Sequence, residues 1–346
     1  MSILEVAREA GVSVATVSRV FNLPDKVAPA TREHVQQVAR ALGYQPNASA
    51  RTLRTQRSRV LGVVLPTLTN PVFAECLDGI AQAAVAGGYA ILPFTTDYRV
   101  AQEDRAVNLL LAGDVDGMIL VVSNPATSTA LQRLGESGLP YVLAYNRHPE
   151  HPCVSVHSEE AVAEAVAQLA ALGHRRITMV SGLLQASDRA QQRCRGYAQG
   201  MERAGLAVQP VQQVPFVATA PELLGALLGS PERPTALVCS NDLLAIRSIR
   251  AAHLAGLAVP RDLSVVGFDG IALGQDLTPQ LGTVVQPNTD IGRHSVELLV
   301  QAIAGNSPLG PEMGLTLAHR FRPGESCAPP ASRGSAPLPF PVPSHP

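Results

Sequence analysis

The sequence has few cysteines and few aromatic residues. Its 346 residues include five cysteines, which are scattered along the chain and never spaced as C-x-x-C. An odd, scattered set argues against both a disulfide framework and a zinc site, so we expect reduced thiols in a cytoplasmic protein. Aromatic residues make up 4% of the chain, and hydrophobic residues make up 46%. This composition is typical of a packed α/β protein whose core consists of Ala, Val and Leu.

Several kinds of functional segment are also absent from the sequence. The first residues, MSILEVAREAGV, lack the cationic stretch and the apolar run of an export signal. No stretch approaches the roughly 20 apolar residues that a membrane span requires. No apolar run is followed by the G-x-G-x-x-G or G-x-x-x-x-G-K-S/T loop that holds a nucleotide phosphate. We therefore expect no export, no membrane insertion, no cofactor, no metal and no Rossmann-type enzyme.

Charge is unevenly distributed along the chain, although the net charge at pH 7 is only −1. Residues 1–60 contain nine Lys or Arg against four Asp or Glu, so the remainder is acidic on balance. A basic N-terminal segment attached to a neutral or acidic body is typical of a nucleic-acid-binding module. A solvated basic surface would give the same count, so the charge needs support from a motif.

The apolar pattern of the first 45 residues predicts a small helical module. One helix is expected after Ser2, a second over residues 14–21 with Ser13 as its N-cap, and a third over residues 31–42. The third helix is expected to end at Gly43.

The rest of the chain is predicted to be mainly an α/β body. Over residues 58–325, short apolar runs alternate with helical patterns, which predicts parallel strands covered by helices on both faces. These runs are too many for one sheet, so we expect two similar halves, the second beginning near Gly173. Residues 46–57 are predicted to be a linker. Residues 326–346, rich in Pro and Ser, are predicted to be a disordered tail.

The second predicted helix has two different faces. A helical wheel places Val17, Val20 and Phe21 on one face and Ala15, Ser18 and Arg19 on the other, with Val14 between them. An exposed helix that begins with small apolar residues suits the major groove of DNA. Val14 and Ala15 can contact thymine methyl groups, and Arg19 can hydrogen-bond to guanine. Ser13, Thr16 and the first amides can hold phosphates. A helical module with a silent surface is the alternative that shape alone leaves open.

Six motifs follow one another along the chain: GVSVATVSRVFN, LGYQPNASARTLRT, LGVVLPTLTNPVFAECLDGI, VDGMIL, LGHRRITMVSG and LSVVGFDG. Together they resemble the lactose/galactose repressor family of bacterial transcription regulators, over residues 2–322. The resemblance implies a helix-turn-helix domain over residues 1–45 and a periplasmic-binding-protein-like domain of two doubly wound subdomains over residues 58–325. It also implies a repressor that binds a palindromic operator as a homodimer and responds to a small-molecule effector.

The resemblance implies roles in DNA binding for the module and for the linker. Val14 and Ala15 would be the principal base readers, as in the galactose-repressor type, which implies an imperfect palindrome with a central CG step. The linker would become a helix on the operator, with Leu53 wedged into the central step of the minor groove, although Leu53 could also be a stray apolar residue. The full predicted set is Ser13, Val14, Ala15, Thr16, Ser18, Arg19, Asn22, Thr31, Tyr44, Asn47, Arg51 and Leu53.

In the body, the resemblance implies an effector site in which Asn, Asp and Arg side chains bind a polyol or a small acid. Its predicted residues are Asn70, Asn146, His157, Arg193, Asn241 and Asp269. Asn70 could instead cap the following helix, and Asp242 is expected to be an N-cap beside the site. Near Ala220, where some members of the family have an aromatic lid, the chain offers no clear aromatic residue.

The identity of the effector follows from departures from the family pattern. His157, Asn146 and Gly270 reduce the negative charge of the cleft relative to many members, which favours an anionic ligand. Because LPTLTNPVFAE and GFDGIALGQ resemble the gluconate-repressor branch, we expect a sugar or a sugar acid such as gluconate. A solute-binding receptor of the same cleft fold is the alternative, but it would need an export signal and would not use residues 1–57.

Overall fold

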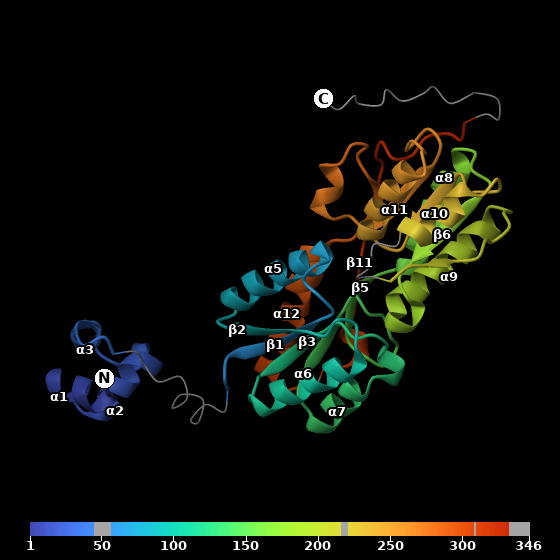
Figure 1. The fold of residues 1–346 in the computed structure, drawn as a ribbon. Helices are drawn as coiled ribbons and strands as arrows, with labels where there is room; N and C mark the ends of the chain where they lie inside the picture. The colour runs from blue at the N-terminus through green and yellow to red at the C-terminus, as the bar shows by residue number, and fades with distance from the viewer. Residues whose placement is uncertain (45–56, 216–220, 308, 332–346) are drawn as a thin grey trace, which may run out of the picture. The chain divides into compact units, whose positions relative to one another are not determined.

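The computed structural model describes residues 1–44, 57–215, 221–307 and 309–331, without the side chains of residues 22, 221 and 222 (Figure 1). Contacts between residues divide the chain into a small unit, Met1–Ser58, and a large unit, Arg59–Pro346. We describe each unit by itself.

The small unit is a bundle of short helices around an aliphatic core. Its helices are α1 (Ile3–Glu9), α2 (Val14–Asn22), the 3₁₀ turn Pro24–Lys26 and α3 (Pro29–Ala41). Ser2 caps α1 as predicted, because its backbone N–H donates to Glu5 Oε2 at 2.6 Å while its hydroxyl accepts from the backbone of Glu5. The helix α3 begins two residues earlier than expected, with Pro29 in the first turn, where a missing N–H is tolerated. The core of the unit is formed by Val6, Ala7, Ala10, Val17, Val20, Val35 and Ala39.

The described part of the large unit contains two six-stranded sheets, which define its first and second halves. The first sheet has the order β11-β5-β4-β3-β1-β2, with β1 (Val60–Leu65), β2 (Ala90–Thr95), β3 (Gly117–Leu120), β4 (Tyr141–Ala144), β5 (Cys153–Val156) and β11 (Leu315–Leu317). The second has the order β12-β10-β9-β8-β6-β7, with β6 (Ile177–Ser181), β7 (Gln212–Gln213), β8 (Ala236–Cys239), β9 (Ser264–Asp269), β10 (Gly282–Val285) and β12 (Arg320–Arg322). All described strand pairs are parallel except β10 with β12.

Helices cover both faces of each sheet, as the sequence predicted (Figure 1). In the first half, Val63 of β1 packs in the cluster that includes α5 and α12, whereas the next residue, Val64, packs in the cluster of α6 and α7. In the second half, Val238 of β8 packs in the cluster that includes α8 and α9, whereas Leu237 packs in the cluster that includes α10 and α11. The helices are α5 (Pro71–Ala86), α6 (Val100–Ala112), α7 (Thr129–Ser137), α8 (Ser158–Ala171), α9 (Asp188–Arg203), α10 (Pro221–Gly229), α11 (Asp242–Leu254) and α12 (Asn288–Gly305), with 3₁₀ turns at Pro125–Thr127, Leu184–Ala186, Ala272–Gln275 and Pro311–Met313.

The chain passes between the two halves at three places in its described part. The passages lie between β5 and α8, between β10 and α12, and between β11 and β12. The expected start of the second half near Gly173 is therefore wrong, because α8 already packs against α9 of the second half. The halves are not two continuous segments either, because α12 and β11 return to the first half.

The predicted start of the disordered tail at residue 326 is also wrong. The Ser326 hydroxyl is buried, donates to the carbonyl oxygen of Val265 at 2.6 Å and accepts from the backbone N–H of Gly282 at 2.9 Å. The backbone N–H of Ala328 donates to Ser264 Oγ at 3.1 Å. These contacts join residues 326–328 to the second sheet.

The helices α5 and α12 approach each other closely at two glycines. A Cβ atom on Gly292 of α12 would lie 2.2 Å from the carbonyl oxygen of Cys76, and one on Gly79 of α5 would lie 2.1 Å from that of Thr289. These contacts involve backbone atoms, so no side chain can move to make room for a methyl group. The packing of α12 on the first half therefore requires glycine at both positions.

We expect Gly292→Ala to lower the free energy of unfolding by roughly 1–3 kcal/mol through overpacking. The matched control is Gly135→Ala in α7, where nothing lies within 4 Å of the added Cβ. That substitution should instead be neutral or stabilise the protein by up to about 1 kcal/mol, because alanine is the better helix former. Urea unfolding followed by circular dichroism measures both changes. Equal stability of the two variants would contradict the close approach of the helices.

Candidate functional site

The helix α2 divides into the buried and exposed faces that the sequence predicted. Val17 and Val20 are fully buried, whereas Val14 is 38% exposed and Ala15 and Arg19 face solvent. Ser13 fixes the start of the helix, because its hydroxyl accepts from the backbone N–H of Thr16 at 3.1 Å and lies 2.9 Å from Thr16 Oγ1. Ser18 is half-buried. The first turn of α2 therefore presents two small apolar side chains and its free backbone donors at the surface.

The other residues predicted to bind DNA have mixed surroundings. Thr31 lies in the first turns of α3 and is half-buried. The ring of Tyr44 packs against Phe21 with the ring centroids 5.8 Å apart, so this side chain also supports the helical core. Asn22 is the last residue of α2, and its side chain is not described. Asn47, Arg51 and Leu53 lie outside the described residues.

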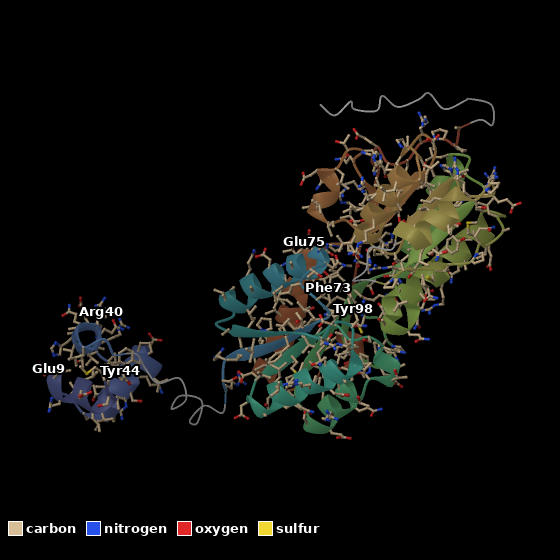
Figure 2. All side chains as sticks on the ribbon, in the orientation of Figure 1. Glu9, Arg40, Tyr44, Phe73, Glu75 and Tyr98 are labelled. Carbon is tan, nitrogen blue, oxygen red and sulfur yellow. The ribbon has the colours of Figure 1, made fainter. Side chains whose placement is uncertain are left out.

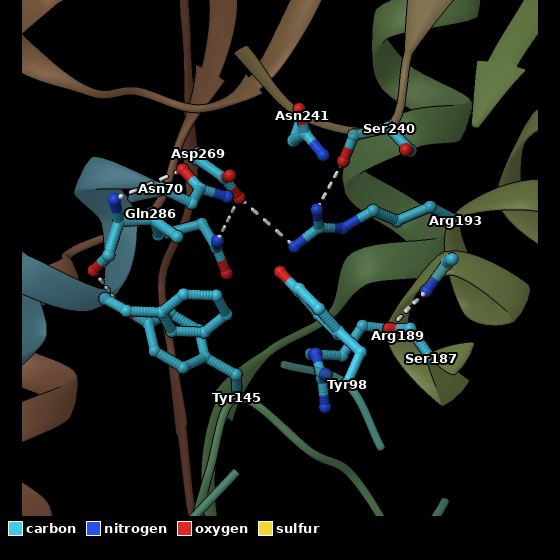
Figure 3. A pocket seen from close by; sticks show the side chains of 13 residues that line it. Asn70, Tyr98, Tyr145, Ser187, Arg189, Arg193, Ser240, Asn241, Asp269 and Gln286 are labelled. Carbon is cyan, nitrogen blue, oxygen red and sulfur yellow. Dashed lines mark hydrogen bonds and ion pairs between the residues drawn. The ribbon is translucent and has the colours of Figure 1, made fainter. Parts of the chain in front are cut away.

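A pocket in the large unit lies between the two halves, at the carboxyl ends of their strands (Figure 3). This is where parallel α/β sheets bind ligands, because loops and helix N-termini converge there. We call this pocket the cleft. It is lined by Asn70, Val72, Phe73, Tyr98, Tyr145, Ser187, Arg189, Ala190, Arg193, Ser240, Asn241, Asp269 and Gln286.

Arg193 of α9 holds the charged centre of the cleft. Its Nη2 atom lies 3.3 Å from Asp269 Oδ1, and its Nη1 atom donates to the carbonyl oxygen of Ser240. The guanidinium also stacks over the ring of Phe268, with Cζ 3.7 Å from the ring centroid. Burial lowers the pKa of Arg193, and the charge of Asp269 opposes that shift. The buried Nε atom has no hydrogen-bond partner among the described residues.

Asp269 is held in a strained conformation at the end of β9. Its φ is +114°, a value that non-glycine residues rarely adopt and that is often found at functional sites. Gln286 Nε2 donates to Asp269 Oδ1 at 2.8 Å, and the side chain of Asn70 also hydrogen-bonds to it. Burial raises the pKa of Asp269 to about 6, against the effects of Arg193 and of these hydrogen bonds. The structure thus brings together the predicted residues Asn70, Arg193 and Asp269.

A second arginine lies at the floor of the cleft. Arg189 Nη1 donates to the carbonyl oxygen of Val122 at 2.8 Å and to Asp188 Oδ1 at 3.0 Å. Its buried Nη2 atom has no hydrogen-bond partner among the described residues. Because a buried N–H without a partner is unfavourable, Nη2 of Arg189 and Nε of Arg193 mark places where the oxygen atoms of a ligand would be stabilised.

Asn146 does not line the cleft, contrary to the prediction. Its side chain is fully buried, and its Nδ2 atom donates to Asp188 Oδ1 at 2.7 Å and to the carbonyl oxygen of Val122 at 2.9 Å. Its Oδ1 atom accepts from the backbone N–H of Val122. The amide group is therefore used to join the two halves behind the cleft.

His157 and Asp242 also differ from the predictions. His157 is exposed at the start of α8 and borders a different groove. Asp242 is not the N-cap of α11. Asn241 is the cap, because its Oδ1 atom accepts from the backbone N–H of Leu244 at 2.8 Å, and Asn241 also lines the cleft. Asp242 is buried and accepts from Thr283 Oγ1 at 2.6 Å and from a backbone N–H at 2.8 Å.

The cleft has an aromatic wall that the sequence analysis missed. Phe73, Tyr98 and Tyr145 all come from the first half, and Phe73 and Tyr145 pack edge to face with their centroids 5.7 Å apart. In Figure 3 the phenol group of Tyr98 points toward the guanidinium of Arg193. Burial raises the pKa of Tyr98 to about 12, which keeps this hydroxyl protonated. Ala220, near which we looked for an aromatic lid, lies outside the described residues.

Comparisons with known proteins identify the family of the chain. The model for bacterial regulatory proteins of the lacI family matches residues 2–47, and the model for a periplasmic binding protein-like domain matches residues 166–327. Catabolite control protein A of Priestia megaterium is 36% identical over 306 residues, covering 87% of this chain and 92% of the relative. The chain belongs to the lacI family. The HTH-type transcriptional repressor CytR of Escherichia coli strain K12 is 34% identical over 307 residues, covering 87% of this chain and 89% of the relative.

Solved structures of lacI-family proteins agree with this assignment. The structure of the lac repressor dimer bound to operator and the anti-inducer ONPF superposes with a TM-score of 0.85 at 26% identity, covering 95% of this chain and 99% of that chain. The cellobiose complex of the transcriptional regulator CelR superposes with a TM-score of 0.69 at 27% identity, covering 94% of this chain and 99% of that chain. The small unit is thus the helix-turn-helix domain and the large unit the periplasmic-binding-protein-like domain.

The lacI-family assignment confirms the predicted fold class and the predicted class of function. The chain is a DNA-binding transcription regulator, and its relatives are regulators rather than enzymes. In the described part of the chain, no helix combines the length and the apolar composition needed to cross a membrane.

We expect the buried carboxyl group of Asp242 to make the stability of this regulator depend on pH. Burial raises its pKa to about 7, the charge of Asp269 adds to this effect, and the hydrogen bond from Thr283 opposes it. The ordinary value is 3.8, so between about pH 4 and pH 7 the folded protein holds a proton that the unfolded chain has released. The free energy of unfolding should therefore fall as the pH rises through this window.

We expect Asp242→Asn, which cannot ionise, to show a shallower fall of the thermal unfolding midpoint between pH 4.5 and pH 7 than the unsubstituted protein. The matched control is Asp276→Asn, because Asp276 is exposed. Calorimetry of the full chain across this range measures the slopes. Equal slopes for the two variants would show that Asp242 does not hold the proton.

Proposed function

We propose that this regulator binds a palindromic operator as a homodimer and that a small sugar or sugar acid in the cleft controls its affinity for DNA. The observation that carries the proposal is the arrangement of Arg189, Arg193 and Asp269. Each of these buried arginines is paired with one buried carboxylate, Arg193 with Asp269 and Arg189 with Asp188, and each keeps an N–H group without a partner among the described residues. Both halves line the cleft in which they lie. Such a site suits a ligand with several oxygen atoms.

The start of α2 supports the DNA-binding part of the proposal. Val14 and Ala15 are exposed on a helix whose opposite face is locked in the core, so the helix can enter a major groove without rearranging. Arg19 is exposed one turn further along and can reach a guanine edge. A two-fold operator requires two copies of this helix, and the similar lac repressor structure is described as a dimer bound to operator.

We expect Arg19→Ala to weaken binding to the operator, identified by selection from random duplexes, by roughly 1–3 kcal/mol. It should also relax the sequence preference at one base pair in each half-site. Arg40→Ala is the matched control, because Arg40 is also an exposed cation but lies on α3. An unbiased selection of duplex oligonucleotides, followed by gel shifts at a fixed salt concentration, measures both effects. If both variants lose the same affinity for operator and for random duplex, α2 is not the reading helix.

The two walls of the cleft support a sugar-like effector. The first half supplies aromatic rings, including Phe73 and Tyr98, which pack well against the C–H face of a sugar (Figure 2). The second half supplies Arg189, Arg193 and Asp269, which suit hydroxyl and carboxylate groups. Arg189 and Arg193 are paired with Asp188 and Asp269, but each keeps an N–H group without a partner among the described residues, which suits the carboxylate of an acid such as gluconate. The similar regulator CelR was solved with cellobiose.

A ligand that touches both halves can also act on the DNA-binding unit. Such a ligand binds better to one arrangement of the halves than to another, and it shifts their population accordingly. A coupling free energy of about 1–3 kcal/mol would change operator affinity roughly 5- to 150-fold, in either direction. Gel shifts with and without the ligand measure this change.

We expect gluconate to raise the thermal unfolding midpoint of the full chain and Arg193→Gln to weaken gluconate binding by roughly tenfold or more, because hydrogen bonds to a charged group are lost. Arg105→Gln, at an exposed position on α6, is the control. Calorimetric titration with gluconate and glucose gives the affinities. If no aldonate or sugar binds, the effector part of the proposal is wrong, while the DNA-binding part stands on the operator selection.

A further inference from the structure

The large unit contains a second groove, which shares no lining residue with the cleft. Its walls come from the residues after β4, from β5, from the start of α8, from α9 and from the segment that leads into β11. It therefore borders the passage of the chain from β5 to α8, where the first half continues into the second. We call it the crossover groove.

The charged groups of the crossover groove are mainly cationic. Arg147 and Arg195 line it, together with one carboxylate, Glu159. Glu159 Oε1 lies 2.7 Å from Arg195 Nη2, so these two charges offset each other. Arg147 donates to Thr316 Oγ1 at 3.0 Å and has no acidic partner within 4.0 Å among the described residues. The groove thus carries one guanidinium charge that the surrounding protein does not neutralise.

Three histidines add hydrogen-bonding groups to the same groove. His148 and His151 lie with their ring centroids 4.9 Å apart, and His157 begins the wall formed by α8. Burial lowers the pKa of His151, with the neighbouring His148 adding to the shift, and the partial loss of water around the largely exposed His157, together with the charge of Arg147, lowers the pKa of His157. Near neutral pH the rings of His151 and His157 are therefore uncharged donors and acceptors, and the arginines supply positive charge.

Two serine side chains line the crossover groove. Ser155 and Ser158 are only 2% and 3% exposed, no hydrogen bond joins either hydroxyl to a described residue, and neither hydroxyl oxygen is among the fully enclosed atoms that lack a partner. Both hydroxyl groups therefore open into the groove and are available to an acceptor. His157 gives no side-chain cap to α8, so the first backbone N–H groups of that 14-residue helix are also open to an acceptor.

We propose that the crossover groove is a second ligand site, which binds a compact metabolite with at least two phosphate or carboxylate groups. Arg147 supplies the charge, and the hydroxyl groups of Ser155 and Ser158 and the first amides of α8 supply uncharged donors. Such a set of donors matches anionic oxygen atoms, and the one carboxylate of the groove, Glu159, is already paired with Arg195.

The position of the crossover groove connects this site to the contacts between the halves. Gln192, whose side chain lines the groove, donates from Nε2 to Asp188 Oδ2 at 3.2 Å. Asp188 in turn accepts from Asn146 and from Arg189, which reaches the floor of the cleft. An anion in the crossover groove would therefore act on the same arrangement of the halves as a ligand in the cleft, with which it shares no lining residue.

Calorimetric titration of the full chain with inorganic pyrophosphate and with citrate, at constant ionic strength, tests this proposal. We expect at least one of these probes to bind, and Arg147→Gln to weaken its binding about tenfold, because a charge-assisted contact is lost. Ser158→Ala should weaken binding by a smaller factor, since it removes one uncharged donor. Arg105→Gln on α6 is the matched control and should leave the affinity for the probe unchanged.

Arg193→Gln separates the crossover groove from the cleft. This variant should keep its affinity for the anion probe while losing the ligand of the cleft, and unfolding midpoints establish that each variant is folded. If Arg147→Gln strongly lowers the unfolding midpoint, Arg147→Lys replaces it in the comparison. The lysine keeps the positive charge but lacks the planar guanidinium group. The proposal is overturned if neither probe binds, or if Arg193→Gln removes binding that Arg147→Gln leaves intact.

Discussion

The buried carboxylate of Asp188 joins the two halves of the large unit. Its Oδ1 atom accepts from Asn146 and Arg189 and its Oδ2 atom from Gln192, while its backbone N–H donates to the carbonyl oxygen of Ser123. Burial raises the pKa of Asp188, and the charge of Arg189 opposes that shift. A buried carboxylate is stable only when its donors are in place. The arrangement of the halves therefore depends on contacts from both of them meeting at one side chain.

The two halves contribute different kinds of side chain to the cleft. This difference explains how the cleft can both bind a ligand selectively and pass the effect of binding to another site. The first half contributes aromatic surface, and the second contributes the pair of Arg193 and Asp269. Neither wall alone offers both an apolar face and a charged edge. A ligand that needs both therefore binds with a free energy that depends on the arrangement of the halves, which is the condition for control of a distant site. The strained φ of +114° at Asp269 shows that the fold holds this carboxylate in place before any ligand arrives.

The parts of the fold that were predictable from sequence are those whose signal is local. The two faces of α2 follow from a 3.6-residue period, and the central strands follow from apolar runs. The passages between the halves carry no such signal. The strand β11 pairs with β5, which lies about 160 residues earlier, and Ser326 bonds to Val265 of β9, so each depends on a partner far away in the sequence. The helix α8 was assigned to the wrong half for the same reason, since its apolar stripe does not say which sheet it covers.

The cleft shows the same limit at the level of single side chains. Asn241 and Asp269 were predictable because their position after a strand places them at the right edge of a sheet. Arg193 lies within α9, and only the resemblance to the family predicted its role. The position of a residue after a strand does not fix the direction in which its side chain points. Asn146 also follows a strand, but its side chain turns away from the cleft to Val122 and Asp188. Tyr145, the residue before it, has a φ of +64°, and it is this backbone turn that sends the tyrosine ring into the cleft and the amide behind it. A positive φ at a bulky residue is unfavourable on its own and persists only where tertiary contacts require it, so no pattern of neighbouring residues predicts it.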